Sequence, residues 1–384
     1  MNSIYVSIIM PIYNAERFLH QSLGSVVDQT LKNIEIICVN DGSTDSSLSM
    51  MKQYAAEDKR IRIIDKANGG YGQSMNCGLR IAKGEYIGIL EPDDFMSKDM
   101  LETLYNIAKK NNADVVKSNY FEYKTKDNSN NFLEVLEGLP YDEITSAEEN
   151  IKIIHMRPCI WSAIYRREML LKNHIVFNET PGASYQDTAF AFKVWVSAQR
   201  VMFVKNAYLH YRIDNDGSSV KSSGKVFNIC DEFQSMQAFL NEDAVKRERY
   251  SKILQVLKLD SYTWNLERIS DDYKSIFQDQ IALDFIEAQY EGYLDKDYFD
   301  KARWSTVQRY IDSYMHSKVS NVNGKRLLKM AAKKAAKKYL LVLDNFISTE
   351  ESCRKFERQS FQQPALVPVS FWRRRLCPKR CCLL

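Results

Sequence analysis

The chain has no long hydrophobic run and no leader-like N-terminus. Nowhere in its 384 residues do about 18 apolar residues follow one another, so we expect no membrane-spanning helix. The first residues lack the charged stretch and apolar core of a secretory signal peptide. We therefore expect neither a signal peptide nor a membrane-spanning helix, and the cysteine usage described next favours a cytoplasmic protein.

Two common nucleotide-binding motifs and a disulfide framework are also missing. The first expected strand is not followed by G-x-G-x-x-G, which disfavours a dinucleotide-binding fold, and no G-x-x-x-x-G-K-[ST] occurs, which excludes a P-loop ATPase. The cysteines are scattered, apart from a terminal group, Cys377, Cys381 and Cys382, that contains no C-x-x-C pair. This usage is typical of reduced thiols, and it predicts neither disulfides nor a zinc site.

Proline is absent between Pro181 and Pro364, and glycine becomes rare after Gly224. In the same region apolar residues recur at intervals of three and four, which is the spacing of one face of a helix. Examples are Val226, Cys230, Phe233, Met236 and Leu240. We therefore expect a helical extension over residues 221–323. No motif in it indicates a role.

Charge is unevenly distributed. Residues 325–384 carry 15 basic and 4 acidic side chains, a net charge of +11, so the rest of the chain must carry −7 to reach the total of +4. Residues 325–347 form a helical pattern whose apolar face lies opposite Arg326, Lys329, Lys333 and Lys337. Together with 371–375 (FWRRR), this predicts a tail region, 324–384, that binds an anionic membrane surface. The alternative is a helix docked on the body of the protein with a solvated lysine face. No nucleic-acid-binding fold accompanies the charge, so nucleic acid is not an expected partner.

The first part of the chain alternates between strand and helix patterns. Apolar strands are expected at residues 6–10, 34–39, 61–64, 86–90 and 114–118, with helical spacing between them. Short strand–helix–strand units of this kind predict an α/β fold with a mostly parallel central sheet and helices on both faces.

Polar residues stand at the carboxyl ends of these strands, where open parallel sheets bind ligands. Three acids surround Pro92 after the fourth strand, and carboxylates suit a divalent cation such as Mg²⁺ or Mn²⁺. The alternative for this turn is a plain acidic cap of the next helix, with Ser97 as the N-cap. An aromatic ring at Tyr13 and a lone acceptor at Asp41 complete a set that fits a nucleoside diphosphate.

Three segments together resemble family 2 glycosyltransferases of the GT-A fold. They are residues 6–14 (VSIIMPIYN), 39–45 (VNDGSTD) and 90–94 (LEPDD), and the resemblance covers about residues 1–220. It implies that the catalytic domain binds a nucleotide-sugar donor. The donor-site positions that it implies are Pro11, Tyr13, Asn14, Asp41, Asp65, Asn68, Gly70 and Asp93.

The resemblance also implies a metal site, with two departures from the family pattern. Asp94 and Asp93 match the end of the metal motif, whereas Glu91 stands where the family has aspartate, with the same charge and one more methylene. Met75 stands where the family often has an arginine that faces phosphate, and Arg212 is a candidate replacement.

An acceptor side is implied by two later segments. Residues 160–167 (IWSAIYRR) resemble the family's acceptor-side segment, and 185–190 (YQDTAF) resemble its acceptor motif, in which Asp187 matches the general base. Trp161, Gln186 and His210 are further acceptor-side positions. The alternative for Asp187 is a plain helix N-cap.

These features predict an inverting glycosyltransferase that moves a sugar, most simply from a UDP-sugar, to a hydroxyl of a glycan or lipid-linked glycan in cell-surface polysaccharide synthesis. We expect it on the inner face of the membrane as a peripheral protein. One alternative is a non-catalytic nucleotide-sugar-binding or scaffold protein. Another is a sugar nucleotidylyltransferase, which would need a glycine- and arginine-rich loop where residues 11–14 (PIYN) stand.

Overall fold

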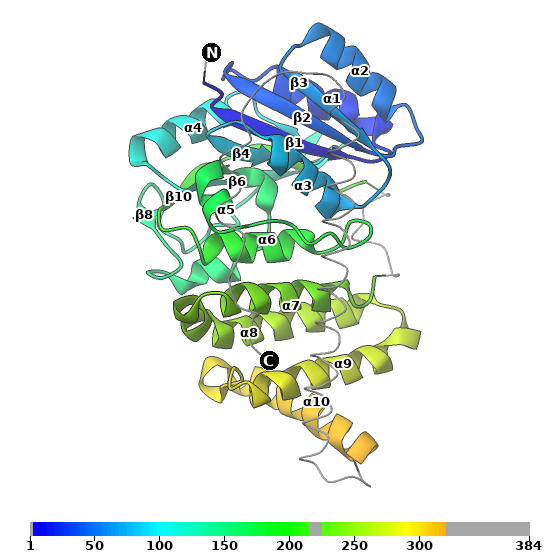
Figure 1. Ribbon diagram of the computed structural model, residues 1–384, viewed down its shortest axis with the longest axis vertical. Coiled ribbons are helices and arrows are strands. Elements are labelled where there is room, and N and C mark those ends of the chain that lie inside the picture. The colour runs from blue at the N-terminus through cyan, green and yellow to red at the C-terminus, as the bar shows by residue number, and fades with distance from the viewer. Residues whose placement is uncertain (1–2, 216–224, 320–384) are drawn as a thin grey trace, which may run out of the picture. The chain divides into compact units, whose positions relative to one another are not determined.

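The computed structural model describes residues 3–215 and 225–319 (Figure 1). Met1–Tyr314 form one compact unit, and a second unit begins at Met315. The predicted membrane-binding helix at 325–347 and the 371–375 segment lie outside the described residues. No helix in the described part of the chain combines the length and the hydropathy needed to cross a membrane.

A mixed sheet forms the centre of the first unit, with strand order β3-β2-β1-β4-β9-β6-β10-β5. Six strands run parallel: β1 (Val6–Ile12), β2 (Ile34–Asp41), β3 (Ile61–Lys66), β4 (Tyr86–Ile89), β6 (Val115–Lys124) and β10 (Val201–Arg212). The antiparallel strands are β5 (Phe95–Met96), β7 (Ser129–Leu133), β8 (Ile144–Thr145) and β9 (Ala163–Arg166). Every residue of β1 and β2 is buried, as expected for strands covered on both faces. The predicted mostly parallel sheet is confirmed.

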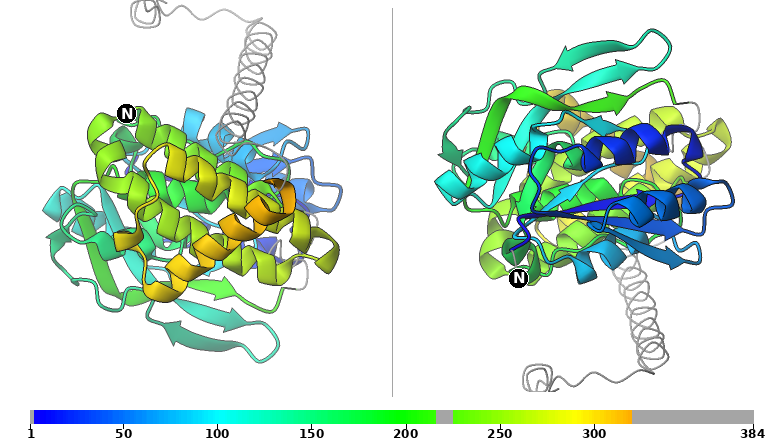
Figure 2. Two further views of the ribbon diagram at one scale, coloured as in Figure 1. Left: turned by 90° about the horizontal axis from the view of Figure 1, so that it is seen from below. Right: turned by 90° about the horizontal axis from the view of Figure 1, so that it is seen from above.

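Helices cover both faces of the sheet. α1 (Glu16–Val27) and α2 (Ser47–Glu57) lie on one face, and α3 (Tyr71–Ile81) lies on the other (Figures 1 and 2). The N-cap residue of α4 (Met100–Asn111) is Asp99, and the hydroxyl of Ser97 instead bonds His210. The alternative in which Ser97 is the N-cap of the helix after the acidic turn (residues 91–94) is therefore wrong.

Further helices form layers below the α3 face. α5 (Arg167–Lys172) and α6 (Gln186–Trp195) lie nearest the sheet, and α7 (Asn228–Asn241), α8 (Ala244–Arg268) and α9 (Asp271–Tyr290) follow in successive layers (Figure 1). α10 (Lys301–Val319) follows α9 in the chain, and short 3₁₀ helices occupy Ile151–His155, Ile160–Ser162 and Lys296–Tyr298. The expected helical C-terminal region is thus present, and its first helix packs on α6.

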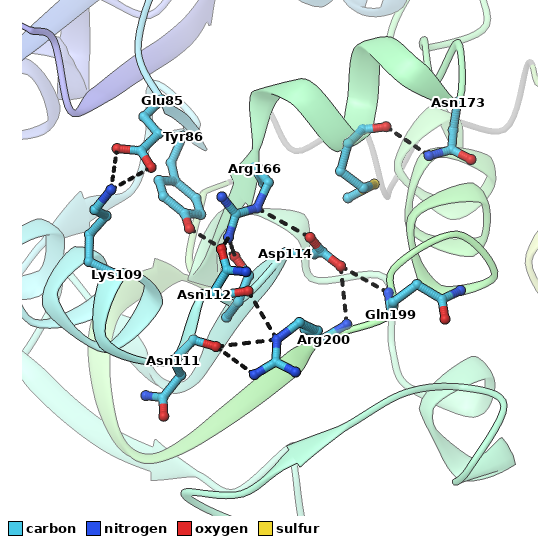
Figure 3. Close-up of polar contacts among 12 residues, drawn as sticks. Glu85, Tyr86, Lys109, Asn111, Asn112, Asp114, Arg166, Asn173, Gln199 and Arg200 are labelled. Atoms are coloured by element: carbon cyan, nitrogen blue, oxygen red, sulfur yellow. Dashed lines mark hydrogen bonds and ion pairs between the residues drawn. The ribbon is translucent and has the colours of Figure 1, made fainter.

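Polar contacts at the amino ends of the strands hold the sheet edge together (Figure 3). Asp114, just before β6, accepts from the Arg166 Nε (3.2 Å) and from the backbone N–H groups of Gln199 (3.0 Å) and Arg200 (3.1 Å). The Arg200 guanidinium in turn donates to the carbonyl of Asn111 (2.8 Å), at the end of α4. These contacts tie β6, β9 and β10 together at the edge opposite the acidic turn.

Candidate functional site

Asp94 is the most deeply buried acid at the carboxyl edge of the sheet, with 1% of its surface exposed. Its Oδ1 accepts from the backbone N–H of Arg212 (2.8 Å), whereas its Oδ2 is buried and has no hydrogen-bond partner among the described residues. Burial, and next the nearby Asp93 carboxylate, raise the pKa of Asp94 well above its usual range. Buried polar atoms are nearly always paired, so this lone oxygen indicates a missing ligand.

Glu91 connects the acidic turn to the start of α3. The Tyr71 hydroxyl donates to Glu91 Oε1 (2.7 Å), and the Tyr71 backbone N–H donates to Gly182, in the segment before α6. Burial raises the pKa of Glu91 to about 8, and the carboxylates of Asp93 and Asp187 contribute to the rise. Glu91 therefore lies within electrostatic reach of both the acidic turn and the predicted base.

The donor set of this turn fits a divalent cation that is only partly held by protein. In the described part of the chain, no three His, Cys, Asp or Glu side chains are grouped as a ready-made metal site. One oxygen of Asp93 accepts from Asn215 (2.8 Å) and one of Glu91 from Tyr71, whereas the buried Asp94 Oδ2 accepts from none of the described residues. Such a set suits Mg²⁺ or Mn²⁺, which take one or two carboxylates and complete their shell with substrate phosphates and water.

Arg212 lies beside the acids, but its guanidinium is already engaged. Nε donates to the Asp93 carbonyl (2.7 Å), Nη2 to Gln21 (2.6 Å), and Nη1 to Thr125. The group also lies over the rings of Phe18 and Tyr123, at 4.6 and 4.8 Å, and the residue is 4% exposed. Arg212 thus supports the acidic turn through protein contacts, and its role at a phosphate stays a prediction.

Asp41 organises the turn between β3 and α3. Its carboxylate accepts from the backbone N–H groups of Gly69 (2.8 Å) and Gly70 (2.9 Å) and pairs with the ammonium of Lys66. Gly70 has φ of +90°, a conformation that glycine adopts readily. A carboxylate has about four acceptor positions, so one on Oδ2 remains for a ligand. Lys66 was not recognised from the sequence, since nothing in its neighbourhood distinguishes it from a surface lysine.

The other predicted donor positions line the ends of β1, β2 and β3. The Tyr13 ring is 52% exposed, and Asn14, with φ of +48°, accepts from the Thr44 N–H (2.8 Å). Asp65 accepts from the Asn40 amide (2.7 Å). Pro11 is buried in β1, and Asn68 is exposed beside Gly69. An accessible aromatic ring thus stands at the same sheet edge as Asp41.

Asp187 lies in the first turn of α6 and is partly buried. Its Oδ1 accepts from the N–H of Thr188 (2.9 Å), and burial raises its pKa to about 6. The N-cap residue of α6 is Tyr185, with no side-chain capping bond, so the plain N-cap interpretation of Asp187 is wrong. The Gly182 carbonyl accepts from the Tyr71 N–H (3.0 Å) and from the Gln186 amide (3.2 Å), and the Tyr71 hydroxyl donates to Glu91, so hydrogen bonds connect the residue before Asp187 to the acidic turn.

The three acceptor-side positions differ in their placement. Trp161 stacks on Tyr211, with 5.0 Å between the ring centroids. The pKa of Tyr211 is raised first by burial and next by the carboxylate of Asp94. Gln186 is 1% exposed and holds Thr180 through a 2.8 Å bond, so its side chain supports a loop and does not face an acceptor. His210 is stacked on Phe95 at 4.3 Å, both of its ring nitrogens have partners, and burial lowers its pKa to about 4. The acceptor-side roles of these positions stay predictions, and the side chains of Gln186 and His210 already have partners within the protein.

Asn76 is a positioning residue that the sequence analysis missed. Its amide donates to the Phe177 carbonyl (2.9 Å) and accepts from the Phe177 N–H (3.0 Å), which ties α3 to the segment that leads into α6. A signal was present, because Asn76 directly follows Met75, the position at which the family often has an arginine.

Comparisons with known proteins identify the family of the chain. The model of the family described as "Glycosyl transferase family 2" matches residues 7–172. The chain is 33% identical over 216 residues to glycosyltransferase GlyG of Streptococcus pneumoniae, covering 54% of this chain and 70% of that protein. It is 35% identical over 214 residues to the uncharacterized glycosyltransferase EpsJ of Bacillus subtilis, of which it spans 60%.

A solved structure is similar over most of the chain. It is S. aureus TarS residues 1–349 in complex with UDP-GlcNAc, with a TM-score of 0.64 and 18% identity, covering 83% of this chain and 94% of that one. At this identity the likeness concerns the fold. Taken with the sequence relatives, it shows that the chain has the GT-A fold and belongs to glycosyltransferase family 2.

Proposed function

We propose that this chain is an inverting glycosyltransferase that transfers a sugar from a UDP-sugar to a hydroxyl of a glycan or lipid-linked glycan, in cell-surface polysaccharide synthesis. The observation that carries the proposal is a chain of hydrogen bonds from Gln186, next to Asp187, through Gly182 and Tyr71 to Glu91 of the acidic turn, since it links a candidate base to candidate cation ligands. The UDP-GlcNAc bound by TarS makes that compound the first donor to test.

Each group has a task in this proposal. The exposed Tyr13 ring stacks on the base of the nucleotide, and the remaining acceptor position of Asp41 receives a base N–H. Asp94, with Asp93 and Glu91 beside it, would hold Mn²⁺ or Mg²⁺, which supplies positive charge at the diphosphate oxygens.

Asp187 removes the proton from the acceptor hydroxyl as it attacks the anomeric carbon from the side opposite the leaving group. Attack from that side inverts the configuration of the sugar. General-base assistance of this kind contributes about 10²–10⁴-fold.

The proposal extends to location. We place the protein in the cytoplasm, as a peripheral protein on the inner face of the membrane, because of the charge and amphipathic pattern of residues 325–347. The acceptor would then be presented at that surface.

A thermal-shift experiment with UDP-GlcNAc, with and without MnCl₂, tests the cation-dependent donor site. A ligand that binds only the native state stabilises it by RT ln(1 + [L]/Kd), about 2.7 kcal/mol at a hundred times Kd. We expect a Mn²⁺-dependent shift in the wild type and its loss in Asp94→Asn. The matched control is Asp114→Asn, the same substitution at the opposite sheet edge, which keeps the shift.

Release of UDP in the same mixtures separates an enzyme from a non-catalytic scaffold. A Mn²⁺-dependent shift without any UDP release, across a panel of UDP-sugars and with water or glycan acceptors, would favour the scaffold. An equal shift in the Asp94→Asn variant would remove Asp94 from the site.

A further inference from the structure

Tyr185 adopts an unfavourable backbone conformation immediately before the helix that carries Asp187. Its φ is +63° and its ψ is 2°, in the left-handed region that large side chains rarely occupy. Such residues persist where their surroundings hold them, and they concentrate at functional sites. The contacts of Tyr185 therefore show what determines the start of α6.

The hydroxyl of Tyr185 is held by α8, a helix of the C-terminal region. It donates to Asn265 Oδ1 at 2.8 Å, and Asn265 is 2% exposed. Asn265 Nδ2 donates to the Val226 carbonyl at 3.0 Å. Because a carbonyl can only accept, this second bond keeps the amide oxygen directed at Tyr185. The neighbouring Trp264 meets the Tyr185 ring edge-on, at 5.9 Å between centroids.

A second set of contacts from α7 holds the segment that leads to Tyr185. Ser235 donates to Asn178 Oδ1 (2.7 Å) and accepts from the buried Lys193 of α6 (2.8 Å). The ammonium of Lys225 donates to the Ala183 carbonyl. The chain from Asn178 to α6 is thus fastened by Ser235 of α7, by Asn265 of α8 and by Lys225, which precedes α7.

We propose that Asn265 is a positioning residue for the transfer reaction, which fixes the carboxylate of Asp187 by holding the hydroxyl of Tyr185. The inference rests on the proposed function, because it assumes that Asp187 is the base. It assigns a role to the helical region, since Asn265 lies well beyond residue 172, where the match to the family model ends. A small misplacement of a reacting group, of about 1 Å, can lower a rate by about a hundredfold.

The test uses the full-length protein with UDP-GlcNAc and MnCl₂ and four variants. Tyr185→Phe removes only the hydroxyl, and Asn265→Leu removes the amide. Asn265→Asp keeps an acceptor oxygen for Tyr185. Tyr293→Phe is the matched control, because it removes a Tyr–Asn hydrogen bond (to Asn241, 3.2 Å) within the same helical region. The two readouts are kcat and KM for UDP release, and hydrogen–deuterium exchange of peptides covering residues 183–190.

We expect Tyr185→Phe and Asn265→Leu each to lower kcat by about ten- to a hundredfold, with donor KM within about twofold of wild type. Exchange in residues 183–190 becomes faster in both. Asn265→Asp retains more activity than Asn265→Leu, and Tyr293→Phe changes neither readout. The double variant of Tyr185→Phe with Asn265→Leu should lose no more kcat than Asn265→Leu alone, since both single variants remove the same bond between Tyr185 and Asn265.

The outcomes separate this inference from the proposed function. Unchanged exchange in Tyr185→Phe overturns the inference whatever the activity, and so does faster exchange with wild-type kcat. If the wild type releases no UDP from any UDP-sugar, the proposed function fails and the positioning role with it. A fall in kcat accompanied by an equal loss in the control variant would also overturn the inference, because it indicates general destabilisation.

Discussion

The two edges of the central sheet carry similar carboxylates in opposite situations. At the amino edge, Asp114 accepts from one guanidinium and two backbone N–H groups, and Glu35 accepts from Ser7 Oγ (2.6 Å), the Lys83 N–H (2.6 Å) and Arg62 (3.3 Å). At the carboxyl edge, Asp94 keeps a buried oxygen with no partner among the described residues. The difference shows that a carboxylate at a strand end indicates a ligand only when its hydrogen-bonding capacity is left unused.

The same contrast separates two arginines. Arg166 at the amino edge and Arg212 at the carboxyl edge are both largely enclosed, and each holds a loop by donating to backbone carbonyls. Arg212 nevertheless leaves Asp94 Oδ2 unpaired, because its contacts go to the Asp93 carbonyl, Gln21 and Thr125. The fold thus supports the acidic turn without neutralising it, as a binding site requires.

The largest expected effect comes from Asp187→Asn, which keeps the shape of the side chain and removes the base. We expect UDP release to fall by about 10²–10⁴-fold while the Mn²⁺-dependent thermal shift with UDP-GlcNAc persists. Asp114→Asn, which removes a carboxylate at the other edge, should leave the rate per folded molecule unchanged. Activity near wild type in Asp187→Asn would contradict the assignment of the base.

An intermediate effect is expected on the free energy of unfolding. Here the substitution at the amino edge has the effect, whereas for activity it is the substitution at the carboxyl edge. Asp114→Asn weakens three hydrogen bonds to one partly buried carboxylate, so it should lower the free energy of unfolding by about 1–3 kcal/mol. Denaturant titration of the native protein and the variant measures this difference. Asp271→Asn is the control, since it breaks an exposed ion pair within α9 and should change nothing measurable. Equal stability of the Asp114→Asn variant and the wild type would mean that the amino edge is not held by this network.

The sequence predicts more of the fold than of the candidate site. Alternating strands and helices, with apolar runs in β1 and β2, predict the parallel core because hydrophobic periodicity is local. The acids at 91–94 and the proposed base at 187 are predicted from motifs that are also local. Partners distant in the chain could not be predicted: Arg212 meets Gln21 across 191 positions, and Tyr185 meets Asn265 across 80. Such pairs depend on how layers pack, so the engaged state of Arg212 and the buried Gln186 were not foreseen.

The smallest expected effect is a pH dependence at the carboxyl edge alone. Because burial raises the pKa of Asp187 to about 6, the base is protonated below that pH, and kcat/KM for UDP release should fall about tenfold per pH unit. Protonation of Asp187 does not unfold the protein, so unfolding caused by this residue cannot explain the fall in kcat/KM. A carboxyl whose pKa is raised in the folded state binds protons more tightly when folded, so its contribution to stability grows as the pH decreases from 6 towards 4. The Asp114→Asn variant should show the same acidic limb, whereas Asp187→Asn should lack it. A limb centred near pH 4 in the wild type would mean that Asp187 is solvated like an ordinary surface acid, and the contrast between the two edges would not extend to it.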